Sequence, residues 1–300
     1  MKKLFSIILS IVMIFSMVAV SITTYYADAV YIVNGYSYNI INNKTVALCG
    51  WDNSTSDLIV PDVIGGRYVA AIADYGFEYN DSITSVDFSN ASQLDYIGID
   101  AFRECTSISS EIIFPETVTS MGERAFQGCT SIPSIVMNAN VDTIPKQCFY
   151  QCSSLETVVL PDSLTTINGF AFADCSSLTY VEIPSSVIII AASAFRNDSN
   201  LTLGVWYGTT GYDYAKAQNI PYVLLDEVKL GDANGDDNIN INDVTTIQRY
   251  LAELETLEGI YLHAADANQD GTVDIADATA IQMYLAEYEM DYPIGEVMTQ

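Results

Sequence analysis

Two twelve-residue stretches near the end of the chain, 232–243 and 266–277, carry oxygen-bearing side chains at the same spacing. Asp or Asn stands at positions 1, 3, 5, 9 and 12 of each stretch. These residues are Asp232, Asn234, Asp236, Asn240 and Asp243 in the first stretch and Asp266, Asn268, Asp270, Asp274 and Asp277 in the second. Carboxylate and amide oxygens are ligands for hard cations, so both stretches are candidate metal-binding loops rather than a merely acidic tail.

The spacing is that of a loop that wraps calcium. Calcium takes about six to eight oxygen ligands, and a twelve-residue loop supplies them from positions 1, 3, 5, 9 and 12 and from the backbone carbonyl of position 7. Asn238 and Thr272 stand at position 7 and would supply the carbonyls. We therefore predict two calcium ions, one in each loop.

The two loops differ at position 6, where the chain must turn sharply. Gly271 adopts a left-handed backbone there at little cost, whereas Asp237 in the first loop adopts it at some cost. The additional carboxylate of Asp237 attracts the cation, so the relative affinity of the two loops stays open.

Each loop is predicted to run into an amphipathic helix that begins at its position-12 Asp. The predicted inward stripes are Val244, Ile247, Tyr250 and Leu251 in the first helix and Ala278, Ile281, Tyr284 and Leu285 in the second. The segment before the first loop, 222–231, favours a strand, and position 12 holds Asp rather than Glu. Both features argue against an ordinary EF-hand sensor.

Residues 228–292 resemble a type I-like dockerin, a small all-α calcium-binding module that binds cohesin domains of scaffolding proteins in cellulosome-type assemblies. The resemblance implies a cohesin partner and a contact face at positions 10, 11, 17 and 18 of each loop-helix unit. These residues are Ile241, Asn242, Gln248 and Arg249, then Ile275, Ala276, Gln282 and Met283.

The contact positions depart from the pattern of many dockerins, which carry a Ser-Thr pair at positions 10 and 11. Ile-Asn and Ile-Ala stand there in this chain and imply a divergent cohesin with a more apolar contact surface. The duplication would allow two docking orientations, whereas Arg249 against Met283 breaks the symmetry. One and two orientations both remain open.

Residues 30–225 carry an internal repeat. Phe recurs at 77, 102, 126, 149, 172 and 195, and the regular units span about 77–200. The unit at 155–175 offers a short strand at 157–160, a turn at Pro161 and a second apolar corner before its Phe. Stacked units cover one another's apolar side chains, which predicts a solenoid of short parallel strands with an irregular second side.

The frame IP-x-x-V-x-x-I-x-x-x-A-F-x-x-C resembles the BspA-like class of bacterial leucine-rich repeats, most closely over 108–198. Irregular segments at both ends of 30–225 resemble the terminal caps of that class. The unit with Phe88 departs from the frame, because Ser89 replaces the Pro and two extra residues precede Phe102. We predict a bulged loop there.

Four Cys occupy one slot, three residues after the Phe: Cys105, Cys129, Cys152 and Cys175. Asn80 and Asp198 take the same slot in flanking units, which favours a side chain that hydrogen-bonds a turn from inside. Disulfides between stacked neighbours, about 4.8 Å apart, remain an alternative. A catalytic thiol is disfavoured because residues 30–225 contain no His to activate it.

The residue predicted to point outward from each strand is Asp87, Ile113, Val136, Val159 and Glu182 in successive units. Three aliphatic residues between two acids form a candidate binding patch for a protein or glycan. The alternative is that β-branched residues simply suit an exposed sheet.

The first 29 residues have the pattern of a secretory signal peptide. Lys2 and Lys3 precede an apolar run at 4–20, and an A-x-A triplet ends at Ala29. We predict cleavage there and a secreted protein without membrane insertion, with an uncleaved anchor as the alternative. The formal charge of −27 makes nucleic acid and anionic lipid implausible partners.

These features predict a secreted, non-catalytic component of a polysaccharide-degrading assembly, held on the cell surface through a scaffold, whose repeats recognise a protein or surface. An enzyme acting on polysaccharide or peptide is one alternative, but the acids of 30–225 are scattered over turns. The single His, His263, lies between the loops and is expected to pack or cap. A cell-surface adhesin is the other alternative.

Overall fold

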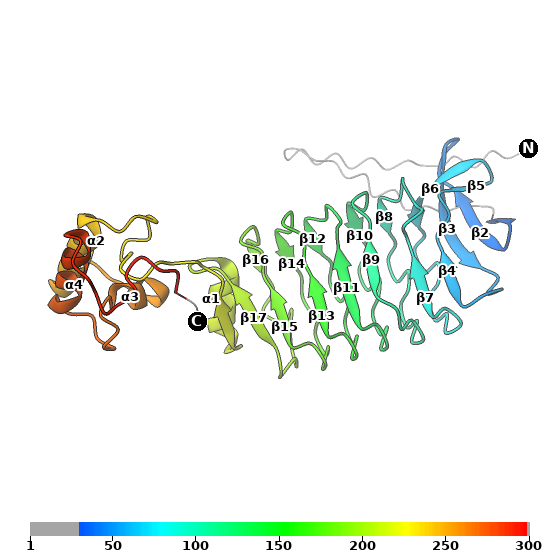
Figure 1. Ribbon diagram of the computed structural model, residues 1–300. Coiled ribbons are helices and arrows are strands. Elements are labelled where there is room, and N and C mark those ends of the chain that lie inside the picture. The colour runs from blue at the N-terminus through cyan, green and yellow to red at the C-terminus, as the bar shows by residue number, and fades with distance from the viewer. Residues whose placement is uncertain (1–29, 299–300) are drawn as a thin grey trace, which may run out of the picture.

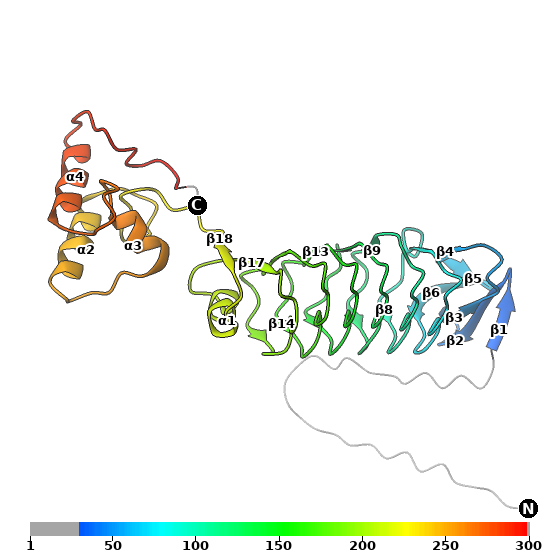
Figure 2. The ribbon, with the colours of Figure 1, turned by 90° about the horizontal axis from the view of Figure 1, so that it is seen from below.

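The computed structural model describes residues 30–298 (Figure 1). The predicted signal peptide, residues 1–29, lies outside the described residues. The described chain forms an elongated, strand-rich solenoid followed by a smaller helical lobe (Figures 1 and 2). Solenoid and helical lobe follow one another in the order predicted from the repeats and the two loops.

The N-terminal end of the solenoid is closed by antiparallel strands. Its sheet contains β1 (Val30–Val33), β2 (Tyr36–Ile40), β3 (Thr45–Trp51), β5 (Val63–Ile64), β6 (Arg67–Ile72), β8 (Tyr96–Ile97) and β10 (Ser120–Met121). β1, β2 and β3 pair antiparallel, and β3 then pairs parallel with β6, where the solenoid proper begins. The antiparallel strands shield the first repeat from water, as a terminal cap must.

The regular part of the solenoid has two strand-bearing sides. One side is formed by β9 (Ile112–Phe114), β11 (Ser134–Met137), β13 (Thr157–Val159), β15 (Tyr180–Glu182), β17 (Thr202–Val205) and β18 (Tyr222–Leu224). The other continues as β12 (Thr143–Ile144), β14 (Thr166–Ile167) and β16 (Ile189–Ile190). All these pairs are parallel, and Val136 faces Val159 in the next unit. One repeat therefore makes one turn.

A stack of Phe rings runs through the core. Successive ring centroids along Phe77, Phe102, Phe126, Phe149, Phe172 and Phe195 lie 5.0–5.7 Å apart, with nearly parallel planes. All six rings are buried. Each unit thus covers the ring of its neighbour, which is why the Phe recurs once per turn.

The unit that carries Phe88 interrupts the regular side. β4 (Asp57–Ile59) and β7 (Ser85–Asp87) form a separate two-stranded sheet, outside the sheet that begins at β9. The Asp87 carboxylate accepts a hydrogen bond from the Ser89 backbone N–H at 2.8 Å and turns the chain where other units have Pro. The interruption falls in the unit for which we predicted a bulged loop.

The Cys ladder hydrogen-bonds turns from inside, as predicted. Each thiol donates to the carbonyl of the Phe one unit earlier, at 2.9 Å from Cys105, 3.0 Å from Cys129, 3.3 Å from Cys152 and 3.2 Å from Cys175. All six Cys of residues 30–298 are free thiols, so the structure does not adopt the disulfide alternative. Burial raises the pKa of these thiols and keeps them protonated donors.

The helix α1 (Thr210–Gln218) closes the C-terminal end of the solenoid. Thr209 caps its first turn, and Asn219 ends it in a left-handed conformation. Tyr214 is buried, and its ring centroid lies 6.1 Å from that of Phe195, at the end of the Phe stack. A polar helix thus replaces the next repeat and covers the last ring.

The helical lobe contains α2 (Ile241–Leu251), α3 (Gly259–Ala265) and α4 (Ile275–Leu285). Its core includes Leu230, Val244, Ile247, Ala278 and Ile281. Its two ends meet, because the backbone N–H of Leu230 donates to Glu296 and that of Gly295 donates back to Leu230. Across residues 30–298, no helix is both long and apolar enough to cross a membrane.

Two predictions for these helices were wrong in detail. The helices begin at position 10, not position 12, because Asn240 and Asp274 at position 9 act as N-caps. The C-terminal end of each predicted stripe is not buried: Leu251, Tyr284 and Leu285 are about two-fifths exposed. All three lie in the last turn of their helix.

The sequence analysis also missed α3, which is only seven residues long and too short to show a clear apolar period. His263 was expected to pack or cap. Its side chain is exposed and does not pack, but its backbone carbonyl accepts the N–H of Asp266, the residue that caps the end of α3.

Candidate functional site

The first candidate loop is folded around the carboxylate of Asp232 at position 1. One carboxylate oxygen accepts backbone N–H bonds from Gly235 at 2.9 Å and Asp236 at 3.1 Å, and the other accepts from Asp237 at 2.9 Å. Asp232 is buried. A single side chain therefore holds the tight part of the loop in place.

The carboxylate at position 12 closes the loop and caps the helix at once. Asp243 is fully buried; one oxygen accepts from the Asn234 backbone N–H at 3.2 Å and the other from that of Asn240 at 2.8 Å. Asn240 and Asp243 form a capping box at the start of α2. This geometry fixes position 12 at the third helical residue.

The second loop repeats the same contacts. Asp266 accepts backbone N–H bonds from Asp270 at 3.0 Å and Gly271 at 2.8 Å. Asp277 accepts from Asn268 at 3.1 Å and Asp274 at 2.8 Å, and it is also fully buried. The duplication in the sequence is thus a duplication of loop geometry.

Position 6 has the left-handed backbone that the sequence predicted in both loops. The φ angle is 64° at Asp237 and 92° at Gly271. Asp237 bears the steric cost of this conformation, and its backbone carbonyl accepts a hydrogen bond from the Lys229 ammonium at 2.7 Å. The first loop is therefore the irregular one.

The buried carboxylates lack a positive partner. Burial, and then the neighbouring carboxylates Asp232 and Asp236, raise the pKa of Asp243; burial and the carboxylates of the second loop do the same for Asp277. Among residues 30–298, no basic side chain forms a salt bridge with either one. A cation bound inside each loop would relieve both the repulsion and the cost of burial.

The donor set fits calcium chemically. Every candidate side chain in the two loops offers carboxylate or amide oxygen, and the position-7 residues Asn238 and Thr272 offer backbone carbonyls. As the described side chains stand, no group of three or more His, Cys, Asp or Glu is assembled around one point. Instead they accept N–H bonds from their own loop, and calcium would compete for the same oxygens.

Family models match two parts of the chain. The model described as the BspA type leucine rich repeat region matches six copies over residues 70–202, and the dockerin type I domain matches residues 230–286. The chain carries a BspA-type leucine-rich repeat region and a type I dockerin domain. The comparison with curated proteins found no match.

Solved structures with a similar chain course are bacterial leucine-rich repeat proteins. A leucine rich cell surface protein of Faecalibacterium prausnitzii is 24% identical over 60% of this chain and 55% of its own, with a TM-score of 0.47. A T. pallidum leucine rich repeat protein is 22% identical over 58% and 85%, also with 0.47. A Eubacterium ventriosum repeat protein is 22% identical over 55% and 50%, with 0.41. This chain spans about half the length of the first.

The eight predicted partner-contact residues of the dockerin are all exposed. Ile241 and Ile275 occupy the first residue of α2 and α4 and are 58% and 61% exposed. Met283 is 39% exposed, whereas Arg249 at the matching position forms a salt bridge with Glu255 at 2.9 Å. The two halves therefore present similar apolar first turns and different second turns.

Four residues of the predicted outward row lie on the sheet formed by β9, β11, β13, β15, β17 and β18, whereas Asp87 lies on β7 in the separate two-stranded sheet. Ile113 and Val159 are about half exposed, Val136 less so, and Asp87 and Glu182 are exposed at the ends. A groove of about 450 Å³ lies at the C-terminal end of this row, where Tyr180 and Trp206 join its lining. The sequence indicated the aliphatic row but not the two aromatic residues beside it.

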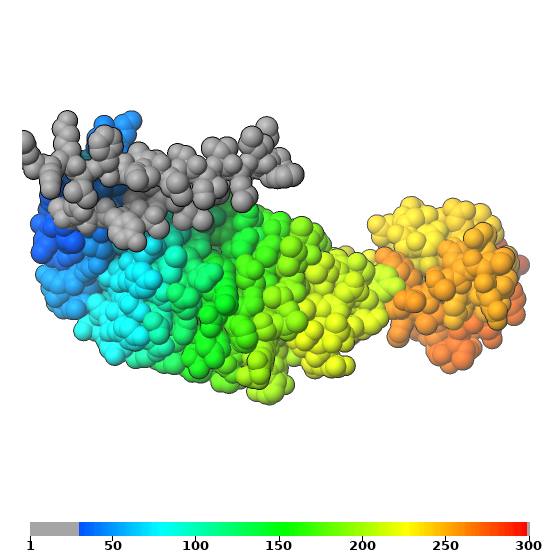
Figure 3. Space-filling view, turned by 180° about the vertical axis from the view of Figure 1, so that it is seen from behind, coloured from blue at the N-terminus to red at the C-terminus, as the bar shows by residue number. Residues whose placement is uncertain are grey.

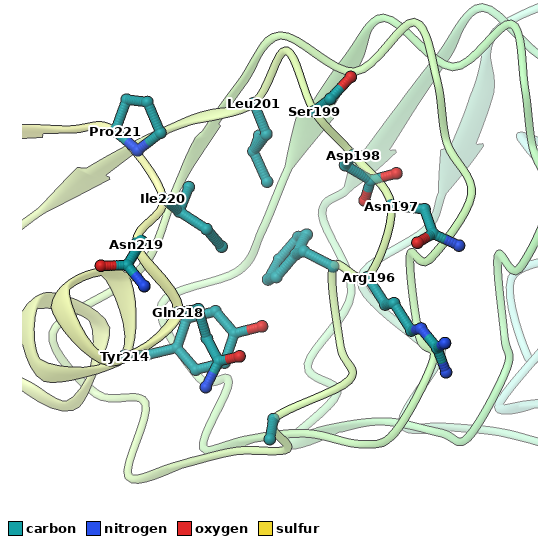
Figure 4. A pocket seen from close by; sticks show the side chains of 12 residues that line it. Arg196, Asn197, Asp198, Ser199, Leu201, Tyr214, Gln218, Asn219, Ile220 and Pro221 are labelled. Carbon is teal, nitrogen blue, oxygen red and sulfur yellow. The ribbon is translucent and has the colours of Figure 1, made fainter.

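A second hollow lies between the last repeat and α1 (Figure 4). It has a volume of about 320 Å³ and includes Asp198, which takes the slot of the Cys ladder in the last unit. Asp198 is buried, and one oxygen accepts from the Cys175 N–H at 2.8 Å. Its other oxygen has no hydrogen-bond partner among the described residues, and burial raises the pKa of the carboxyl to about 7.

Solenoid and dockerin meet through aromatic side chains that the sequence analysis did not single out. The Tyr207 ring stands perpendicular to that of Tyr261 in α3, with centroids 5.3 Å apart. Gly259 and Gly235 lie directly against these two rings, where a side chain would collide. Figure 3 shows the dockerin as a separate lobe beyond the end of the solenoid.

Proposed function

We propose that this chain is a secreted, non-catalytic component of a cellulosome-type, polysaccharide-degrading assembly. The dockerin binds two calcium ions and then a cohesin domain of a scaffolding protein, and the repeat region recognises a protein partner. The signal-peptide pattern at residues 1–29 supports export, and both module types are typical of extracellular or cell-surface proteins.

The observation that carries the proposal is the pair of buried position-12 carboxylates, Asp243 and Asp277. Each holds a loop and a helix N-terminus together and has no positive partner among the described residues. The calcium ligands we propose are the ten side chains at positions 1, 3, 5, 9 and 12 and the carbonyls of Asn238 and Thr272. Calcium binding and ordering of the dockerin are then one linked equilibrium.

The cohesin contact face we propose comprises the exposed positions 10, 11, 17 and 18 of both units. Ile241 and Ile275 project at the N-terminal ends of α2 and α4 and would form the apolar centre of the contact. Exposed apolar side chains at the centre of an interface contribute most to affinity. The pairs that differ between the two units, Asn242 against Ala276 and Arg249 against Met283, would then set any preferred orientation.

The experiment is a calcium titration of the chain from residue 30 onward, measured by calorimetry and far-UV circular dichroism. We expect two ions per chain and a gain of helical signal. Asp243→Asn and Asp277→Asn should each weaken one of the two sites by about tenfold or more, since each replaces a bidentate carboxylate by an amide of the same size. The amide oxygen can still accept one of the two backbone N–H bonds.

Glu289→Gln is the matched control, because it removes one exposed carboxylate from the same module outside both loops. It should retain two ions at unchanged affinity. If the chain bound no calcium, or if the control lost as much affinity as the position-12 variants, the proposed sites would be wrong.

A further inference from the structure

The side of the solenoid formed by β9, β11, β13, β15 and β17 differs in charge from the corners of the turns that carry the repeated Phe. All four basic residues of 77–205 lie within about three residues of a repeated Phe in the sequence: Arg103, Arg124, Lys146 and Arg196. Two of them are engaged there, since Arg103 pairs with Glu78 at 2.8 Å and Arg124 with Asp100 at 2.7 Å. The strands β9, β11, β13, β15 and β17 and the turns that directly follow them carry acids and no Lys or Arg.

The groove at the end of this sheet collects the unpaired acids. Glu156 lines it from the residue before β13, Asp162 from the turn after β13, and Glu182 from β15. All three are exposed, and no salt bridge or side-chain hydrogen bond engages their carboxylates within residues 30–298. β13, β15 and β17 lie side by side on one sheet (Figure 1). The three carboxylates line the same groove, so their charges share one surface.

Apolar and aromatic groups stand among the carboxylates. Val159 is 53% and Tyr180 43% exposed, and Trp206 follows β17 at the same groove. The Tyr180 ring extends over Gly204 of the next strand, where a side chain would collide with its hydroxyl. A glycine at this point leaves room for the ring to lie against the sheet with one face accessible.

We propose that this groove binds an extended, Lys- or Arg-rich segment of a partner protein. A cationic side chain would sit among Glu156, Asp162 and Glu182 over the Tyr180 ring, and its methylene stem would cover Val159. The volume of about 450 Å³ admits more than one such side chain. The inference rests on the proposed role of the repeat region in protein recognition and names the partner's chemistry.

A glycan fits the same surface less well. Sugar hydroxyls need both donors and acceptors, and aromatic rings alone do not select between a sugar and a cation. The side-chain donors of the lining are hydroxyls and the Trp206 indole N–H, with no amide or basic side chain, and its formal charges are all negative. Charge complementarity therefore favours a cationic peptide.

The test measures by fluorescence anisotropy how a fluorescent peptide of alternating Arg and Leu binds to the calcium-loaded chain from residue 30 onward. The comparison probes are an alternating Glu and Leu peptide and a xylo-oligosaccharide. We expect binding of the Arg peptide alone, weakened by salt. Asp162→Asn should weaken it roughly two- to fivefold, and the triple variant Glu156→Gln, Asp162→Asn, Glu182→Gln by at least about tenfold.

Glu116→Gln is the matched control, because Glu116 follows Pro115 as Asp162 follows Pro161, two units away and outside the groove. It should leave binding unchanged. Equal loss in Glu116→Gln and Asp162→Asn would mean non-specific attraction and overturn the proposal. Tighter binding of the oligosaccharide, or no binding of the Arg peptide, would overturn it as well.

Calcium-dependent capture of the same samples by a cohesin separates this inference from the proposed function. A chain that is captured by cohesin but ignores the Arg peptide contradicts only the groove proposal. A chain that binds the peptide without cohesin capture contradicts the proposed assembly role.

Discussion

At the scale of single residues, buried carboxylates are the unusual groups of this protein. Asp243 and Asp277 each accept two backbone N–H bonds and lie beside further acids. Asp198 accepts only one hydrogen bond, at the end of a ladder otherwise occupied by thiols. The first two sit where a cation would fit, whereas Asp198 lies beside a hollow with no such loop.

Asp198 makes the stability of the solenoid depend on pH. Its pKa rises from 3.8 to about 7 on folding, so folding favours the protonated form. Its contribution to the free energy of unfolding is complete below about pH 4 and is lost as the pH rises through about 7. We expect Asp198→Asn to be more stable than the parent at pH 8, on the order of 1–2 kcal/mol, and nearly equal at pH 4.

The difference in the free energy of unfolding is measured by urea unfolding at pH 4 and pH 8, with the near-UV signal of the solenoid as the readout. Asn already occupies the equivalent slot at Asn80, so the substitution suits the turn. Asp142→Asn, which removes an exposed carboxylate elsewhere on the solenoid, is the control and should not gain stability at pH 8. Equal stability of the Asp198 variant and the parent at pH 8 would contradict the account.

At the scale of elements, the strands are short and the Phe stack supplies the continuity between them. β8, β10, β12, β14 and β16 contain only two residues each. Such strands contribute few backbone bonds, so a unit depends on the rings above and below it. The stack, rather than either sheet, is therefore expected to determine cooperativity.

Phe149→Leu should destabilise the solenoid by about 1–3 kcal/mol, because it leaves a gap between Phe126 and Phe172 that both neighbours line. Thermal unfolding by circular dichroism checks the change. Tyr68→Leu, on the exposed side of β6, should cost well under half as much. A similar loss in both variants would indicate that the stack has no special weight.

The sequence predicted the repeat, the strand side and the left-handed position 6, because each rests on a pattern repeated within the chain. The calcium ligands of the two loops stay a prediction. The sequence analysis placed each helix start two residues late, because it began the helix at the position-12 Asp. In the structure Asn240 and Asp274 at position 9 are the N-caps. The sequence analysis also gave no sign that Gln147 and Gln151 adopt left-handed backbone on either side of Phe149. Carbonyls of the next unit accept their N–H bonds, which no local rule anticipates.

At the scale of the whole molecule, one chain joins a dockerin domain to a leucine-rich repeat region. Val228, Ile260 and Ala264 form a small apolar cluster at the joint, with Tyr207 and Tyr261 packed against it. Single residues from distant segments build this joint, so no sequence period could reveal it. The groove on the solenoid and the exposed first turns of α2 and α4 belong to different lobes, which suits simultaneous binding of two partners.

The central claim is tested most directly by titrating cohesin domains of candidate scaffolding proteins into the chain from residue 30 onward, by calorimetry. In calcium we predict a complex of one cohesin per chain, lost on chelation and restored when calcium returns. Replacing Ile241 and Ile275 together by Ser should weaken it by about tenfold or more, with calcium stoichiometry unchanged. Cohesin binding that persists without calcium, or that ignores both isoleucines, would contradict the account.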